Sequence, residues 1–311
     1  MIASLSKDAG TSTGPVIIDT DIGTDIDDAY ALALAIKGGL QIAGISTVSG
    51  NTLKRGRIAK KMLVLGGKKD VPVFAGKNSR VLLTYDRWVP EFEVLDIHQG
   101  VDAMIEHYWH VIEQHRTGRV QIVAIGPLSN IAAVRDRDGT RFDDRAQLII
   151  MGGSFRWSIM GIKIPEYNMF LDRRAARAII SSHVPTRIVP LDVTVNLRLK
   201  REDMAFLKLH ASEDALLDGV LKMTAMFRSS IIGHRLPILF DPATIVPLFD
   251  SSVLAFTRMP VVVNRCGFTR VPKMLAPGVV DKEVCTAIDV SRFYDFFFTL
   301  MTGASQKPPG Q

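Results

Sequence analysis

The sequence predicts an α/β fold, namely a single domain with an open, mostly parallel sheet and helices on both of its faces. Short, apolar, β-branched segments alternate with longer amphipathic or Ala- and Leu-rich segments over most of the 311 residues, as in repeated strand–helix units. The 47% hydrophobic content can bury a large core, and no linker divides the chain. We therefore expect one domain over residues 15–311, after a polar, disordered tail over residues 1–14.

The first strand–helix units are the most regular. Residues 15–18 are apolar and β-branched, which predicts a buried parallel strand, and residues 28–36 are rich in Ala and Leu, which predicts a helix. The unit recurs as a strand over residues 42–48 and a basic, amphipathic helix over residues 54–65. A third short strand over residues 71–75 is followed by irregular, aromatic-containing sequence.

The alternation continues toward the end of the chain. Residues 154–165 show no periodicity, which suggests a loop over a functional site. Asp172 is a predicted N-cap of a helix that ends near residue 182, and Pro242 stands at the first position of another helix. The other expected elements are helices over residues 100–116, 201–209, 213–232 and 291–301, and strands over residues 120–125, 146–151, 186–191, 260–263 and 284–290.

Composition excludes several classes of protein. The 38 basic and 32 acidic residues give a net charge of +6, and because the basic residues are scattered, no nucleic-acid partner is expected. Cys266 and Cys285 lie far apart without metal-ligand spacing, which fits a reducing compartment. The N-terminus resembles no secretory signal, and no apolar run reaches the ~18 residues of a membrane-spanning helix. We expect a cytoplasmic protein without a membrane partner.

Five carboxylates crowd into ten residues between the first strand and its helix. They lie at the carboxyl end of the strand, which is where open α/β sheets bind their ligands. A helix N-terminus favours one or two carboxylates, but five repel one another unless a cation lies among them, and a hard cation with oxygen ligands fits best. The alternative is helix capping plus solvated turn charge. The residues are Asp19, Asp21, Asp25, Asp27 and Asp28.

Other predicted strands also end in polar residues, which should collect at the same edge of the sheet. They are carboxylates, amides and hydroxyls, and none is an activated nucleophile of the Gly-x-Ser-x-Gly or Cys–His type, which argues against acyl transfer. Carboxylates suit Ca²⁺ or Mg²⁺, and amides suit the hydroxyls of a sugar. The residues are Asn51, His98, Ser129, Asn130, Glu166, Asn168, Asp192 and Asp241.

The acidic stretch also resembles a known signature. Ile18-Asp19-Thr20-Asp21-Ile22-Gly23 followed by Asp27-Asp28-Ala29 is similar to the motif of the calcium-dependent, inosine-uridine-preferring nucleoside hydrolases. Five motifs in order over nearly the whole chain form a specific signal. The further matching segments are Ser46-Thr47-Val48-Ser49-Gly50-Asn51, Gly126-Pro127-Leu128-Ser129-Asn130, Glu166-Tyr167-Asn168 with Asp172, and Asp241-Pro242, with a similar ending around Asp289 and Arg292.

This resemblance implies a Rossmann-like nucleoside hydrolase fold, with residues 15–311 as the catalytic domain. It implies Ca²⁺-dependent hydrolysis of the N-glycosidic bond of ribonucleosides, which gives ribose and free base for salvage, in a homodimer or homotetramer. Asp21, Asp28, Asp241 and the backbone carbonyl of Ser129 would bind Ca²⁺, with Asp21 also the general base. The residues expected to contact substrate are Asp27 on the ribose hydroxyls, and Asn51, Glu166 and Asn168 around the sugar.

The sequence departs from the family pattern near the base and the 5′ end of the substrate. Phe240 stands where many members have a histidine that helps the base to leave; a phenyl ring could stack on the base but cannot donate a proton. Met160 and Val195 replace residues that are commonly Asn and His. His98 precedes Gln99-Gly100, where the family often has a His-Gly element, and it either lines the site or is structural.

Two other functions remain open on the sequence. Asp19-Thr20-Asp21 resembles the nucleophile motif of the Mg²⁺-dependent haloacid-dehalogenase-like phosphatases, although Asp27-Asp28-Ala29 has no place in that family. The departures at Phe240, Met160 and Val195 would also suit a family member that binds ribosyl ligands without hydrolysing them efficiently, or that has altered specificity.

Overall fold

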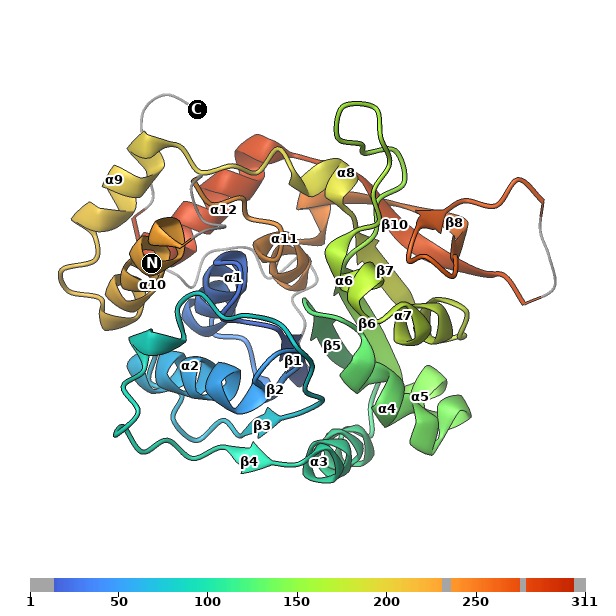
Figure 1. Cartoon of the computed structure of the whole chain (residues 1–311), viewed down its shortest axis with the longest axis horizontal. Coiled ribbons are helices and arrows are strands. Elements are labelled where there is room, and N and C mark those ends of the chain that lie inside the picture. Colours follow the sequence, from blue (N-terminus) through green and yellow to red (C-terminus); the bar gives the residue numbers. More distant parts are fainter. Residues whose placement is uncertain (1–13, 231–235, 275–277, 305–311) are drawn as a thin grey trace.

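The protein contains one large sheet between two layers of helices (Figure 1). The computed structural model describes residues 14–230, 236–274 and 278–304. Within them, ten strands form a sheet in the order β4-β3-β2-β1-β5-β6-β7-β10-β8-β9. The strands are β1 (Val16–Thr20), β2 (Ile42–Thr47), β3 (Val73–Ala75), β4 (His98–Gln99), β5 (Val120–Ala124), β6 (Ala146–Met151), β7 (Thr186–Val189), β8 (Leu254–Val263), β9 (Thr269–Arg270) and β10 (Val280–Ile288).

The first seven strands pair only in parallel, which confirms the predicted sheet. β1 lies between β2 and β5, with Ile18 opposite Ile45 on one side and Val123 on the other. Every residue of β1 is buried, as expected for a strand that is covered on both faces. Parallel strands require crossover connections, and the intervening helices supply them.

One edge of the sheet is antiparallel. β10 pairs in parallel with β7 and antiparallel with β8, and β8 continues antiparallel to β9. The strands expected over residues 260–263 and 284–290 belong to this edge, but both begin earlier in the structure. Several residues of β8 are exposed, so the first part of this strand is not a continuous apolar run and was not predicted.

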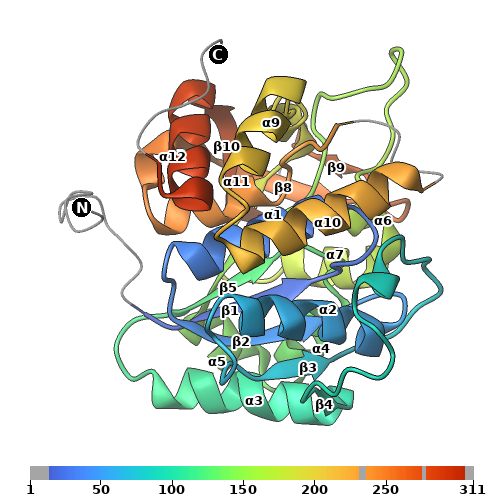
Figure 2. The same ribbon diagram turned by 90° about the vertical axis from the view of Figure 1, so that its left-hand side faces the viewer.

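Helices cover both faces of the sheet (Figure 2). Val16 and Ile18 of β1 face the core under α1, α2 and α9–α12, whereas Ile17 faces the core under α3, α4, α5 and α7. The helices are α1 (Asp27–Lys37), α2 (Thr52–Leu65), α3 (Val101–Gln114), α4 (Ser129–Arg137), α5 (Gly139–Arg145), α6 (Tyr167–Leu171), α7 (Arg173–Ile180), α8 (Leu191–Thr194), α9 (Arg201–Leu209), α10 (Ala215–Ser229), α11 (Pro242–Ile245) and α12 (Val290–Thr302).

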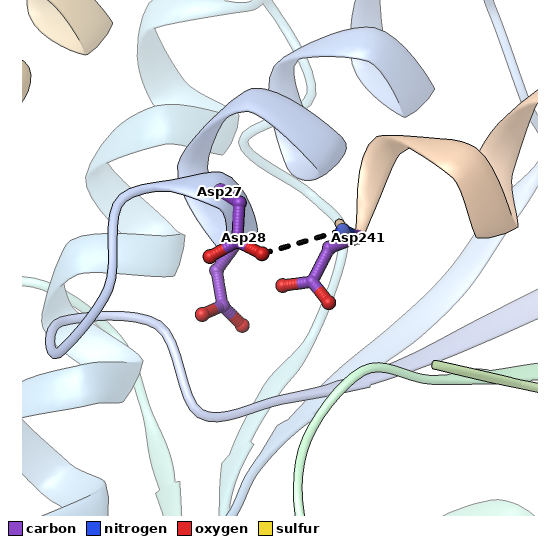
Figure 3. Close-up of side chains that lie close together, drawn as sticks. All are labelled: Asp27, Asp28 and Asp241. Carbon is purple, nitrogen blue, oxygen red and sulfur yellow. Dashed lines mark hydrogen bonds between the residues drawn. The ribbon is translucent and has the colours of Figure 1, made fainter. Parts of the chain in front are cut away.

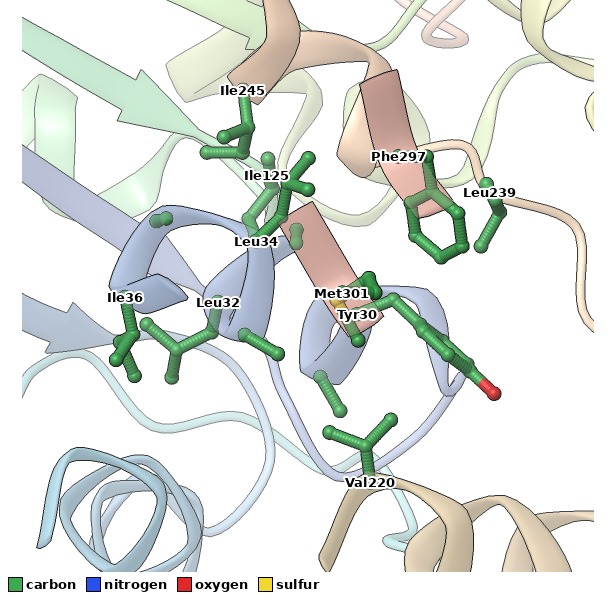
Figure 4. Close-up of a cluster of buried hydrophobic side chains, with 14 of the residues drawn as sticks. Tyr30, Leu32, Leu34, Ile36, Ile125, Val220, Leu239, Ile245, Phe297 and Met301 are labelled. Carbon is green, nitrogen blue, oxygen red and sulfur yellow. The ribbon is translucent and has the colours of Figure 1, made fainter. Parts of the chain in front are cut away.

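Helix α1 is almost completely enclosed. Its residues 27–36 are all buried, and Tyr30, Leu34 and Ile36 contribute to the core shown in Figure 4. Helices α10, α11 and α12 pack around it. Burial on all sides explains why the helix is rich in Ala and Leu and lacks a polar face, and it fixes the acidic turn that precedes the helix.

Short helices were missed in the sequence. Glu166 starts α6 by accepting hydrogen bonds from the backbone N–H groups of Asn168 and Met169, and five residues are too few to show a helical period. The strand expected over residues 186–191 ends at Val189, and α8 follows. The expected tail over residues 1–14 lies outside the described residues, except for residue 14. The last two residues of the helix expected over residues 213–232 also lie outside them. Within the described residues, no helix is both long and apolar enough to span a membrane.

Candidate functional site

The turn between β1 and α1 is held in a defined shape. The Thr20 hydroxyl donates to the Asp28 carboxylate and accepts a hydrogen bond from the Ile22 N–H at 3.1 Å. Gly23 has a φ of 118°, a conformation that glycine adopts without steric cost. Its N–H donates to the Tyr85 hydroxyl at 2.9 Å, which fastens the turn to a distant loop. These contacts orient the carboxylates without a ligand.

A fully buried arginine also supports the turn. The Arg55 guanidinium on α2 donates to the backbone carbonyl oxygens of Asp21 and Ile22, to that of Ser49 at 2.7 Å and to the Thr24 hydroxyl at 2.8 Å. Its donors thus bind backbone and hydroxyl oxygens, and the structure shows no ion pair between Arg55 and a carboxylate among the described residues. This role of Arg55 could not be predicted from the sequence, because a basic residue on an amphipathic helix is ordinarily solvated.

Three carboxylates meet where two helices begin (Figure 3). Asp27 and Asp28 start α1, and Asp241 precedes α11; one oxygen from each lies within 4.8 Å of the others. The Asp241 N–H donates to Asp27 at 3.3 Å, but its carboxylate makes no capping bond to α11. All three side chains are buried. Oxygen ligands at this spacing suit a hard cation.

Burial makes the charged forms of these groups unfavourable. It raises the pKa of Asp21 to about 6, although the nearby Arg55 partly offsets the effect. The pKa values of Asp27, Asp28 and Asp241 rise well above the usual range, first through burial and then through repulsion from neighbouring carboxylates. A bound cation would relieve both costs.

The carboxylates line a cavity of about 1050 Å³. Apolar and aromatic side chains line the same cavity, among them Trp157, Tyr167 and Phe240. A pocket with convergent polar groups and an apolar wall is the common form of a small-molecule site. The predicted site residues that line it are Asp21, Asp27, Asp28, Glu166, Asn168, Phe240 and Asp241.

The chain matches the family described as inosine-uridine preferring nucleoside hydrolase over residues 16–295. It belongs to this family. Probable uridine nucleosidase 2 of Arabidopsis thaliana is 26% identical over 277 residues, which cover 82% of this chain and 83% of that protein. The pyrimidine-specific ribonucleoside hydrolase RihA of Shewanella woodyi is 30% identical over 80% of each chain. The purine-preferring ribonucleoside hydrolase of Gardnerella vaginalis has the same fold, with a TM-score of 0.76 and 21% identity over 93% of this chain and 98% of that chain.

Ser129, the predicted carbonyl ligand of this nucleoside hydrolase, lies outside the cavity lining. It is the first residue of α4, where the backbone carbonyl serves the helix, and its hydroxyl donates to Asp172 at 2.6 Å. Ile125 at the end of β5 does line the cavity, and its carbonyl oxygen accepts a hydrogen bond from Asn168 at 3.3 Å. Ile125 therefore lines the cavity where Ser129 does not, and the carbonyl ligand itself stays a prediction.

Two more predicted substrate contacts lie outside the cavity lining. Asn51 is exposed and caps α2, accepting a hydrogen bond from the Lys54 N–H at 3.0 Å. His98 is exposed on β4, and its ring stacks on Phe74 at a centroid distance of 4.8 Å. In the structure Asn51 therefore serves as a helix cap, and His98 is a surface histidine. A residue at the end of a strand shares the correct edge, but its side chain need not point to the pocket.

Glu166 and Asp19 are acidic residues whose carboxylates accept hydrogen bonds from the protein itself. The Glu166 carboxylate accepts hydrogen bonds from the N–H groups of Gly153, Asn168 and Met169, so it holds the cavity wall in place. Asp19 is fully buried behind the turn, where it accepts hydrogen bonds from Ser46 and, at 2.7 Å, from Asn130. Asp19 thus joins neighbouring elements behind the turn.

Proposed function

We propose that the protein hydrolyses the N-glycosidic bond of ribonucleosides and that Ca²⁺ binds among Asp21, Asp28 and Asp241. The observation that carries the proposal is the buried carboxylate cluster in a cavity that aromatic side chains also line. The carboxylates suit ribose and a hard cation, and the aromatic side chains suit a nucleobase. Membership of the nucleoside hydrolase family supports the same reaction.

The donors of the carboxylate cluster fit a calcium ion. They are carboxylate oxygens, with the Ile125 carbonyl as a further candidate, and the described residues that line the cavity include no Cys or His. Asp21 lies next to Gly126, the residue after Ile125, since a Cβ on Gly126 would meet the Asp21 backbone nitrogen at 3.0 Å. When bound, the cation supplies a Lewis acid that makes water more acidic.

Each side chain of the site then has its own role in the reaction. Asp21 accepts a proton from the attacking water as the general base. Asp27 accepts hydrogen bonds from the ribose hydroxyls, and the surrounding carboxylates stabilise the positive charge that develops on the ribose in an oxocarbenium-like transition state. Asn168, held by Ile125 and Met151, is placed to orient the sugar. Glu166 keeps the wall rigid through backbone contacts.

Calcium should stabilise the protein more at pH 8 than at pH 5. Without a cation, the folded protein holds protons on Asp21, Asp27, Asp28 and Asp241 more tightly than the unfolded chain does, because burial raises their pKa values. The stability they contribute is present at low pH and is lost as the pH rises through about 6 for Asp21 and through the raised pKa values of the other three carboxyl groups. Calcium competes with those protons, so its benefit grows with pH.

Thermal unfolding with chelator and with excess Ca²⁺ measures this effect. We expect Tm to rise on calcium addition by several degrees more at pH 8 than at pH 5. Magnesium at the same concentration controls for ionic strength. An equal calcium shift at both pH values would contradict proton competition at these carboxylates.

A panel of ribonucleosides assayed for free ribose tests the proposed reaction. We expect ribose and base in equal amounts, loss of turnover in chelator and recovery when Ca²⁺ is restored. The matching 2′-deoxynucleosides should react far more slowly, because Asp27 then lacks a hydroxyl partner. Tight nucleoside binding without ribose release would instead indicate a ligand-binding protein, and phosphate release from phosphomonoesters alone would indicate a phosphatase.

A further inference from the structure

Arg198 lines the same cavity as the carboxylate cluster and the aromatic residues Trp157 and Phe240. We propose that Arg198 binds the nucleobase and stabilises the negative charge that the base acquires as it leaves. This inference rests on the proposed hydrolysis and supplies a leaving-group contact for a chain that has Phe240 directly before Asp241. Phe240 can stack on a base but has no hydrogen to donate to it.

The backbone around Arg198 directs its side chain into the cavity. Residues 197–199 and 237–239 run antiparallel: Leu199 N–H donates to the Pro237 carbonyl at 2.9 Å, Leu239 N–H donates to the Leu197 carbonyl at 2.8 Å, and Arg198 forms a bridge with Ile238.

Side chains alternate between the two faces of this short ladder. Leu197, Leu199 and Leu239 are fully buried in the core. Arg198 and Ile238 point the other way and line the cavity, as does Phe240, two residues beyond Ile238. Arg198 and Phe240 therefore belong to the same wall, and Asp241 of the carboxylate cluster follows Phe240 directly.

The Arg198 guanidinium has one hydrogen-bond partner in the described part of the protein and keeps other N–H donors for a ligand. Its Nη1 donates to the Leu236 carbonyl at 3.2 Å, and the Tyr294 hydroxyl donates to the Arg198 carbonyl at 3.0 Å. A guanidinium has five N–H donors, and the described residues show no other hydrogen bond or ion pair from this one. Donors therefore remain for a ligand.

Arg198 differs in charge from the other described residues that line the cavity. Six carboxylates line the cavity, and among the described lining residues Arg198 is the one with a positive charge. Trp157, Val195 and Phe240 line the same cavity and offer a base apolar surface to cover. An arginine in an aromatic environment suits a planar, polar ring, because it can donate hydrogen bonds in the plane of the ring or stack on it.

The proposed step balances without a protonated leaving group. The oxygen of water bonds to C1′ of ribose while the bond from C1′ to the base nitrogen breaks, and that electron pair stays on the base. Asp21 receives the proton of the water, and solvent later protonates the departed base. An N–H of Arg198 donates a hydrogen bond to an oxygen of the base, and this hydrogen bond strengthens as negative charge develops on that oxygen. Because arginine does not lose its proton near neutral pH, it stabilises the anion but does not act as an acid.

The substrates implied are ribonucleosides whose base carries a keto oxygen. In such bases the negative charge of the leaving anion spreads to the oxygen, which is a hydrogen-bond acceptor for the guanidinium. A 6-amino group in the same place is a donor and would oppose Arg198.

The test compares Arg198→Met with the unaltered chain on uridine and on p-nitrophenyl β-riboside. The nitrophenolate leaves without help, so the second substrate requires the same ribose chemistry but no leaving-group contact. We expect Arg198→Met to lower kcat for uridine by about 100-fold, as for loss of a single oxyanion donor, and to change kcat for the nitrophenyl riboside by less than about 3-fold. Arg198→Lys, which keeps a charged donor, should recover part of the uridine rate.

The outcomes distinguish a failure of the Arg198 inference from a failure of the proposed hydrolysis. Equal losses on both substrates would assign Arg198 a structural role and overturn the inference, as would an unchanged uridine rate. Retained nitrophenyl riboside activity shows at the same time that Arg198→Met is folded. If the unaltered protein released ribose from neither substrate, the proposed hydrolysis itself would fail, which is distinguishable from a failure at Arg198 alone.

Discussion

Replacing Asp21 with asparagine is expected to lower kcat for ribose release by about 10³-fold, within the range for loss of a general base. Asparagine keeps the shape of the side chain but cannot accept the proton of the attacking water. The Asp21 backbone carbonyl, which Arg55 holds, is unchanged by the substitution. Because burial disfavours the charged carboxylate, its removal should not lower stability in chelator.

Kinetics at saturating Ca²⁺ separate the role of Asp21 as a base from its proposed role as a ligand. Asp86→Asn is the matched control, since it removes a carboxylate outside the cavity lining whose ion pair with Lys54 is partly exposed. We expect that variant to retain kcat within about 2-fold, because such pairs contribute little. A fall of less than 10-fold for Asp21→Asn at saturating calcium would assign the proton transfer to another group.

Asp241→Asn is expected to have opposite effects on stability with and without calcium. In chelator it should raise Tm, because it removes a buried carboxylate whose charge is disfavoured by burial and by Asp27 and Asp28. In calcium it should lower Tm relative to the unaltered chain, because a ligand is lost. Calcium affinity should fall at least about 100-fold, and ribose release should fall with it, since ligand charge sets the affinity of such sites.

Calcium titrations followed by Tm and by ribose release measure both effects. Asp250→Asn is the control: its carboxylate pairs with Arg292 at 2.7 Å and accepts a hydrogen bond from Ser252, so its loss should lower stability equally in calcium and in chelator. If Asp241→Asn lowered Tm equally under both conditions, Asp241 would be structural and not a ligand.

Much of the fold could be predicted because its signals are local. The buried strands β1, β2, β5 and β6 are short apolar runs between turns, and α9 has the predicted bounds. The missed helices α6 and α8 have five and four residues, and a single polar cap or the end of a strand determines them. The antiparallel edge was partly hidden because its strands are exposed on one side.

The candidate site could also be predicted only in part. Ligands bind at the carboxyl ends of parallel strands, and this rule predicted that Asp21, Asp28 and Asp241 lie together. All three line one cavity, although Asp241 is far from the other two in sequence. The rule failed for Asn51 and His98, because position at an edge does not determine the direction of a side chain. Arg55 and Arg198 could not be found from sequence, since their roles depend on a turn and on a ladder formed between distant segments.

The position of the cation tests the central claim most directly. A crystal grown with Ca²⁺ and ribose should place one calcium ion about 2.3–2.6 Å from carboxylate oxygens of Asp21, Asp28 and Asp241. The ribose hydroxyls should lie against Asp27, with the C1′ carbon toward Phe240 and Arg198. Calcium bound elsewhere, or ribose in the cavity without calcium at those three carboxylates, would contradict a calcium-and-ribose site at the acidic turn.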